Sequence, residues 1–130
     1  MNEVSSRSAD EQMTIAELKQ LVAEFVDQRD WQQFHSPKNL SMALAIEAAE
    51  LMEHFQWISM EASRDVVANP EKLAEVAEEM SDVLCYLLGL ANELNIDISS
   101  ALESKMSKNR EKYPAAVFRG KYGVEDLDNG

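Results

Sequence analysis

The chain has 130 residues, which suits one domain, and a net charge of −12 at pH 7. Apolar residues make up 45% of it, which excludes disorder by composition, and the excess of acid disfavours nucleic-acid polymers and anionic membranes as partners. No apolar run reaches the ~18 residues that cross a bilayer, and no signal peptide is evident, so a cytoplasmic location is expected. If the ligand carries phosphates, some positive charge must lie between it and so acidic a chain, and a divalent cation is the simplest candidate.

The first predicted helix follows a polar N-terminal segment. Thr14 is a suitable N-cap, and Glu17, three residues later, completes a capping box. Apolar residues recur at helical spacing through Val26, so we expect the helix to reach about Trp31 or Phe34.

Two proline-containing motifs predict the starts of the next two helices. Ser36-Pro37 and Asn69-Pro70 each place a capping side chain before a proline at the first helical position. These helices are expected to cover residues 38–57 and 70–94, with a short extra turn between them.

A fourth helix, capped by Asp97 or Ser99, is expected to end near Tyr113. No strand pattern is present, so the predicted fold is all-α, a bundle of about four helices in a domain spanning residues 14–114. Residues 1–13 and 115–130 are expected to be tails. The sulfur-containing side chains are expected to lie in the core: Met42, Met52, Met60, Met80, Met106 and the one cysteine, Cys85.

Four carboxylates form the most informative pattern in the sequence. Glu47 and Glu50 lie on the second helix and Glu79 and Asp82 on the third, each pair at i,i+3 and beside apolar residues. Like charges one turn apart near a core are unfavourable unless a cation compensates them. Hard oxygen ligands suit magnesium, which keeps waters and binds substrate phosphates.

Two alternatives compete with a magnesium site. A di-iron carboxylate bundle uses Glu-x-x-His motifs, but His54 follows Glu50 by four residues, so this alternative is weak. The other is a non-catalytic helical interaction protein in which the acids only form a solvated surface.

The order of motifs resembles that of the all-α nucleoside triphosphate pyrophosphohydrolases, the MazG-like group, and especially its dCTP pyrophosphatase branch. The resemblance covers roughly residues 18–119, with no departure in the motif residues. It is carried by Glu47-x-x-Glu50 with Glu79-x-x-Asp82, by Asp30-Trp31-x-x-Phe34-His35-x-Pro37-Lys38-Asn39-Leu40, by Phe55-Gln56-Trp57, by Ser81-Asp82-Val83-Leu84-x-Tyr86-Leu87, and by Lys105-Met106-x-x-Asn109-Arg110-x-x-Tyr113-Pro114.

This resemblance implies a magnesium-dependent enzyme that cleaves a nucleoside triphosphate between its α and β phosphates and releases pyrophosphate. Glu47, Glu50, Glu79 and Asp82 are the implied metal ligands, and Glu50 is the candidate to orient or deprotonate the attacking water. It also implies a homodimer or a homotetramer, with a pocket completed by helices of neighbouring subunits.

The remaining candidates are substrate-binding residues. Aromatic rings stack on nucleobases and an imidazole bonds to a base edge, which nominates Trp31, His35, Trp57 and Tyr86. Cationic and polar side chains suit the phosphates, and these candidates are Lys38, Lys105, Asn109, Arg110 and Tyr113. The preferred substrate implied is dCTP or a modified dCTP.

Overall fold

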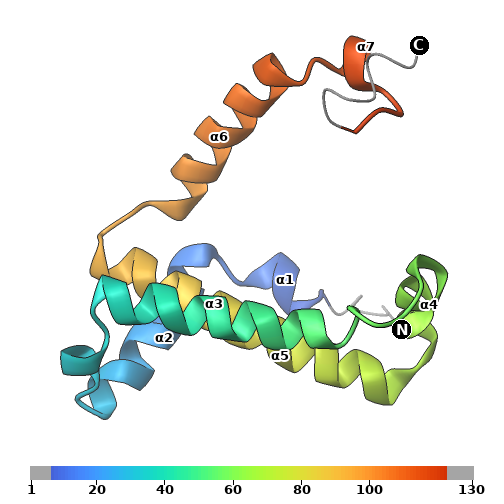
Figure 1. Cartoon of the computed structure of the whole chain (residues 1–130). Helices are drawn as coiled ribbons and strands as arrows, with labels where there is room; N and C mark the ends of the chain where they lie inside the picture. The colour runs from blue at the N-terminus through green and yellow to red at the C-terminus, as the bar shows by residue number, and fades with distance from the viewer. Residues whose placement is uncertain (1–6, 123–130) are drawn as a thin grey trace, which may run out of the picture. The chain divides into compact units, whose positions relative to one another are not determined.

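The computed structural model describes residues 7–122, and every regular element in that range is a helix (Figure 1). The all-α fold class is therefore confirmed. The four long helices are α2 (Ile15–Gln28), α3 (Pro37–Glu53), α5 (Pro70–Glu93) and α6 (Ile98–Lys112). The short elements are α1 (Ala9–Gln12), α4 (Met60–Asp65), α7 (Ala115–Phe118) and the 3-10 turns η1 (Gln32–Phe34) and η2 (Val66–Ala68).

Side-chain caps begin the long helices where the sequence predicts them. Thr14, Ser36 and Asn69 each accept a hydrogen bond from the backbone N–H three residues on, at 3.1, 3.1 and 3.2 Å. Asp97, and not Ser99, caps α6 by accepting from a backbone N–H at 3.0 Å. These caps satisfy N–H groups that have no partner inside the helix.

Two helices end earlier than expected. At the end of α2, Asp30 adopts a φ of 53°, and the N–H of Trp31 donates to Val26 O at 3.1 Å. A left-handed residue stops helical propagation, so α2 ends at Gln28 and Trp31 lies in the following turn. Likewise α3 ends at Glu53, and a non-helical turn carries the chain to α4.

The central helix of the first compact unit is α5, which packs against both α3 and α2. In Figure 1, α3 and α5 run side by side in opposite directions. Asn92 Nδ2 donates to Lys19 O at 3.0 Å and Lys19 Nζ donates to Ile96 O at 2.9 Å, which joins α2 to the end of α5. The buried apolar side chains are Val26, Leu40, Val76, Leu88 and Ala91.

Many apolar side chains expected in the core are instead exposed in the single chain. The methionine prediction is wrong for all five residues: Met42, Met52, Met60, Met80 and Met106 are 43–69% exposed. Cys85 is exposed too, on the wall of an apolar groove of about 420 Å³, here called the α2–α5 groove. Its lining residues are Leu18, Leu21, Val22, Phe25, Ser81, Leu84, Cys85 and Leu88.

The chain divides into two compact units, one up to Ile96 and one from Asp97 onward. The second unit holds α6 and α7, and within it Tyr113 packs edge-on against Phe118 at 5.2 Å between ring centroids. The division falls inside the domain predicted for residues 14–114, and α1 and α7 fall in the predicted tails. Between residues 7 and 122, no helix is long and apolar enough to cross a membrane.

Candidate metal and nucleotide site

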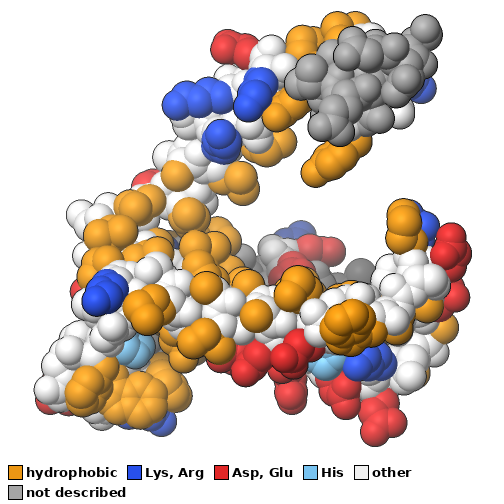
Figure 2. All heavy atoms as spheres, viewed as in Figure 1, with side chains coloured by type: hydrophobic (Ala, Val, Ile, Leu, Met, Phe, Trp, Pro, Cys, Tyr) orange, Lys and Arg blue, Asp and Glu red, His pale blue; other side chains and the backbone are white. Residues whose placement is uncertain are grey.

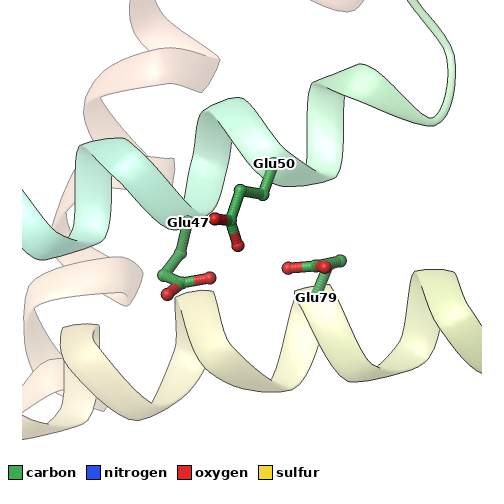
Figure 3. A group of neighbouring side chains, drawn as sticks. All are labelled: Glu47, Glu50 and Glu79. Carbon is green, nitrogen blue, oxygen red and sulfur yellow. The ribbon is translucent and has the colours of Figure 1, made fainter.

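Three of the four predicted carboxylates converge between α3 and α5. Glu47 and Glu50 project from α3 toward α5, and Glu79 projects from α5 toward α3 (Figure 3). One carboxylate oxygen of each lies within 4.8 Å of the others. The i,i+3 spacing puts Glu47 and Glu50 on one face of α3, and antiparallel packing brings Glu79 opposite them. We call these three residues the acid cluster.

Two oxygens of the acid cluster are buried without a partner. Glu47 Oε2 and Glu79 Oε2 are inaccessible to solvent, and neither forms a hydrogen bond with a described residue. A polar atom that is removed from water without a hydrogen-bond partner is unfavourable, and more so when it carries charge. Such oxygens suggest a ligand that completes their coordination.

Two acids of the cluster, Glu47 and Glu79, have a raised affinity for protons. A side-chain hydrogen bond with Glu50, then burial, then the charges of neighbouring carboxylates raise the pKa of Glu47 to about 7. Burial raises the pKa of Glu79, as do the charges of Glu50 and Asp82, while the charge of His54 lowers it. Between about pH 4.5 and 7 Glu47 therefore retains a proton that an isolated Glu would release.

This donor set fits magnesium. The three residues offer only carboxylate oxygens, two of which have no other partner, and hard divalent cations bind such oxygens. When bound there, magnesium would supply Lewis acidity and neutralise phosphate charge. Glu47, Glu50 and Glu79 would hold it, and the retained proton would be released.

A small aromatic cavity lies beside the cluster in the same unit. Trp31, His35 and Tyr86 line it together with Leu40, and its volume is about 80 Å³. Trp31 also packs edge-on against Phe25 at 5.7 Å, and its ring lies 6.4 Å from that of His35. Tyr86 follows Glu79 by seven residues on α5, so it lies two turns from the acid cluster along the same helix face. Burial, then the charge of Glu47, raises the pKa of Tyr86.

Comparison with known proteins agrees with this arrangement. The model of the MazG-like family matches residues 42–121, a stretch that contains the acid cluster. The chain belongs to the MazG-like family. The chain is 44% identical over 107 residues to dCTP pyrophosphatase 1 of Rattus norvegicus and 43% identical over 106 residues to that of Homo sapiens.

Those alignments cover 82% of this chain but 63% of the rat protein and 62% of the human protein, so the chain spans less than two thirds of their length. The crystal structure of a pyrophosphatase from Archaeoglobus fulgidus DSM 4304 superposes with a TM-score of 0.70 at 38% identity. That match covers 86% of this chain and 99% of the archaeal one, which supports the MazG-like fold for nearly the whole described chain.

The remaining predicted site residues lie outside both the acid cluster and the aromatic cavity. Asp82 lies outside the convergent group and is exposed, although its charge raises the pKa of Glu47 and Glu79. Trp57 is 87% exposed after the end of α3, and it does not line the cavity of Trp31. Lys38 is exposed in the first turn of α3.

The predicted phosphate-binding residues of the second unit lie on α6 or directly after it. Asn109 donates a long hydrogen bond to Met106 Sδ at 3.9 Å, and Lys112 Nζ lies 5.3 Å from the ring centre of Tyr113. Lys105 and Asn109 share one face of α6 by their i,i+4 spacing, and Arg110 is in its last turn. Their contact with phosphates stays a prediction.

Sequence reasoning considered His54 only as an iron ligand and so missed its relation to the acid cluster. The residue caps the C-terminus of α3, and its charge acts on Glu79 across the α3–α5 pair. The available signal was the Glu50-x-x-x-His54 spacing, which puts both residues on one face of a helix.

Proposed function

We propose that this protein hydrolyses a nucleoside triphosphate to the nucleoside monophosphate and pyrophosphate in a magnesium-dependent reaction. The preferred substrate is dCTP or a modified dCTP, and the biological role is removal of surplus or damaged nucleotides. The names of the relatives support this activity: the rat and human proteins are dCTP pyrophosphatases, and the archaeal structure is a pyrophosphatase.

The observation that carries the proposal is the acid cluster, with two unpartnered buried oxygens, next to a cavity lined by aromatic rings and an imidazole. Phosphoryl chemistry requires mainly positioning and charge neutralisation, which a cation beside a base pocket provides. A solvated acidic interaction surface would leave neither Glu47 Oε2 nor Glu79 Oε2 buried, so the alternative of a non-catalytic interaction protein is disfavoured.

In the proposed reaction, water adds across the bond between the α and β phosphates. The water oxygen bonds to phosphorus, the bridging phosphoanhydride bond breaks, and pyrophosphate leaves. Glu50 takes the proton of the attacking water or orients that water. Asp82 completes the metal ligands with the three residues of the acid cluster.

Substrate-binding roles follow from side-chain chemistry. Trp31, His35 and Tyr86 hold the base in their cavity, and Trp57 contributes a further stacking surface. Phosphate oxygens are bound by side chains that donate hydrogen bonds or carry positive charge: Lys38, Lys105, Asn109, Arg110 and Tyr113.

The proposal includes self-association into a homodimer or a homotetramer in the cytoplasm. The α2–α5 groove and the exposed methionines leave more apolar surface uncovered than an isolated small chain usually does. A second copy of the chain would cover that surface, most simply through a two-fold axis.

A substrate panel tests the activity directly. Purified protein is incubated with each canonical and several modified triphosphates, with and without Mg²⁺, and the products are separated chromatographically. We expect the monophosphate and pyrophosphate in equal amounts, only with Mg²⁺, and fastest with a dCTP-type substrate. Release of orthophosphate and a diphosphate, or no turnover of any triphosphate, would refute the proposal.

A further inference from the structure

His54 lies at the border of the acid cluster. It follows Glu50 by four residues, one turn further along the same face of α3, and occupies the C-cap of that helix. The side chain is half-buried, with its ring edge-on to Phe55 at 6.5 Å. Neither ring nitrogen forms a hydrogen bond with a residue between 7 and 122. The imidazole is therefore held in place by packing while its polar atoms are available.

The site has a direction along the α3–α5 pair. The aromatic cavity is lined by Leu40, seven residues before Glu47 on α3, and by Tyr86, seven residues after Glu79 on α5. His54 instead follows Glu47 by seven residues, at the other end of α3. Because α3 and α5 are antiparallel, the cavity and His54 lie on opposite sides of the acid cluster. The order along the pair is the cavity, then the cluster, then His54.

A nucleoside triphosphate has the same linear order: base, sugar, α-phosphate, then the pyrophosphate half. With its base in the cavity and its phosphates over the acid cluster, its β and γ phosphates extend toward His54. Phosphates that extend beyond a cluster of carboxylates need hydrogen-bond donors there. An imidazole N–H bonds well to a phosphate oxygen. Several basic side chains of the first unit are engaged elsewhere: Lys19 with Ile96 O, Arg29 with Phe25, and Lys72 with Glu75.

Building on the function proposed above, we propose that His54 donates a hydrogen bond to the β- or γ-phosphate and thereby binds the pyrophosphate half of the substrate. His35, at the other end of the site, binds the nucleoside half. The two histidines of the chain thus divide recognition of one molecule between them, on opposite sides of the bond that breaks.

Calorimetric titration with two separate product probes tests this division. Inorganic pyrophosphate and dCMP, each with Mg²⁺, are titrated into wild type, His54→Leu, His54→Gln and His35→Ala. We expect His54→Leu to weaken pyrophosphate binding about tenfold, the usual loss for a hydrogen bond to a charged group, and to leave dCMP binding within about twofold. His54→Gln keeps an N–H donor and should recover part of the loss, while His35→Ala should show the opposite pattern.

Gln56→Ala is the matched control, because Gln56 is exposed in the same turn of the chain. It should bind both probes as wild type does, and circular dichroism should show equal helicity for every variant. Normal pyrophosphate binding by His54→Leu, or equal weakening of both probes, would overturn the inference, since equal weakening indicates a structural role.

The same titrations separate failure of this inference from failure of the proposed function. If wild type hydrolyses triphosphates but His54→Leu binds pyrophosphate normally, only the role of His54 is wrong. If wild type neither hydrolyses triphosphates nor binds pyrophosphate with Mg²⁺, the proposed function fails and the role of His54 fails with it.

Discussion

The two sides of α5 differ sharply in chemistry. Toward α3, the helix presents Glu79 to two further glutamates, and two oxygens of that group have no partner. Toward α2, it presents apolar side chains such as Leu84 and Leu88 to an apolar groove. Figure 2 shows acidic side chains gathered along one edge of the α3–α5 pair and apolar ones over the neighbouring surface.

This contrast separates function from stability within one helix. Crowded carboxylates destabilise the metal-free fold, so they are explained by what they bind and not by what they contribute to packing. An apolar face gains free energy in proportion to the area that it removes from water, so it is explained by what covers it. Substitutions on the acid side should therefore lower turnover without lowering stability. Substitutions on the apolar side should instead weaken self-association.

The largest effect is expected from the acid side. Glu50→Gln should reduce turnover by at least about a hundredfold, because changes even to the partners of metal ligands cost 10–100-fold. Asp82→Asn should do the same if Asp82 is the fourth ligand. Neither variant should lose thermal stability without metal, since each removes a repulsive charge at nearly constant volume. Steady-state kinetics check the loss of turnover, and melting curves check the unchanged thermal stability. Near-normal turnover of Asp82→Asn would show that Asp82 does not belong to the site.

On the apolar side, Leu84→Glu should disrupt assembly and leave the acid cluster in place. Leu84 is 41% exposed and lines the α2–α5 groove, so a charge there would be buried at a subunit interface. We expect wild type to sediment as a dimer or tetramer at micromolar concentration and the self-association constant of Leu84→Glu to fall at least about tenfold.

Gln20→Glu is the control for that experiment, because it adds the same charge at an exposed position of α2 outside the groove. It should sediment as wild type does. A wild-type protein that stays monomeric at micromolar concentration would show that the exposed apolar side of α5 is not covered by a second copy.

The pH dependence of stability tests the acid side without any substrate. Glu47 has its pKa raised from 4.5 to about 7 in the folded chain, so the folded state holds a proton that the unfolded state has released. Its contribution to stability is full below pH 4.5 and is lost as the pH rises through 7. The melting temperature of the metal-free protein should therefore fall by several degrees from pH 5 to pH 8.

Millimolar Mg²⁺ should reverse that loss at pH 8, because metal binding needs deprotonated ligands and stabilises only the folded state. Glu47→Gln, which cannot titrate, should flatten the pH dependence and abolish most of the magnesium effect. If Mg²⁺ left the melting temperature unchanged at every pH, with and without nucleotide, the metal site would be contradicted.

Local patterns in the sequence were sufficient for the helix starts and for the acid cluster. Capping depends on a few adjacent residues, and the i,i+3 spacing with antiparallel packing was enough to bring Glu47, Glu50 and Glu79 together, although not Asp82. The end of α2 was not predictable, because it depends on Asp30 adopting a left-handed conformation. Methionine burial was predicted wrongly, since an apolar residue on a helix does not specify which surface covers it.

The sequence also could not predict which residues far apart in the chain lie together in the fold. The sequence grouped Trp57 with Trp31, yet the turn that ends α3 leaves Trp57 almost fully exposed and outside the aromatic cavity. Similarly, i,i+3 spacing placed Asp82 beside Glu79, but Asp82 is exposed and is not among the three acids whose oxygens lie within 4.8 Å of one another. Neither outcome follows from spacing alone, because each depends on how a whole helix is oriented.

The smallest effect is expected in base selectivity. The cavity of Trp31, His35 and Tyr86 is mostly apolar, and stacking tolerates different bases, whereas hydrogen-bonding sites reject analogues that lack the matching group. We therefore expect kcat/KM for dCTP to exceed that for other triphosphates by about 10–100-fold, a margin typical of apolar pockets. His35→Ala should lose activity mainly through a higher KM and should narrow that margin, because it removes one of the few polar groups in the cavity. Competition kinetics with paired substrates measures the margin for wild type and variant. If ATP were the best substrate by a wide margin, or if His35→Ala lowered kcat alone, the cavity would not be the base site.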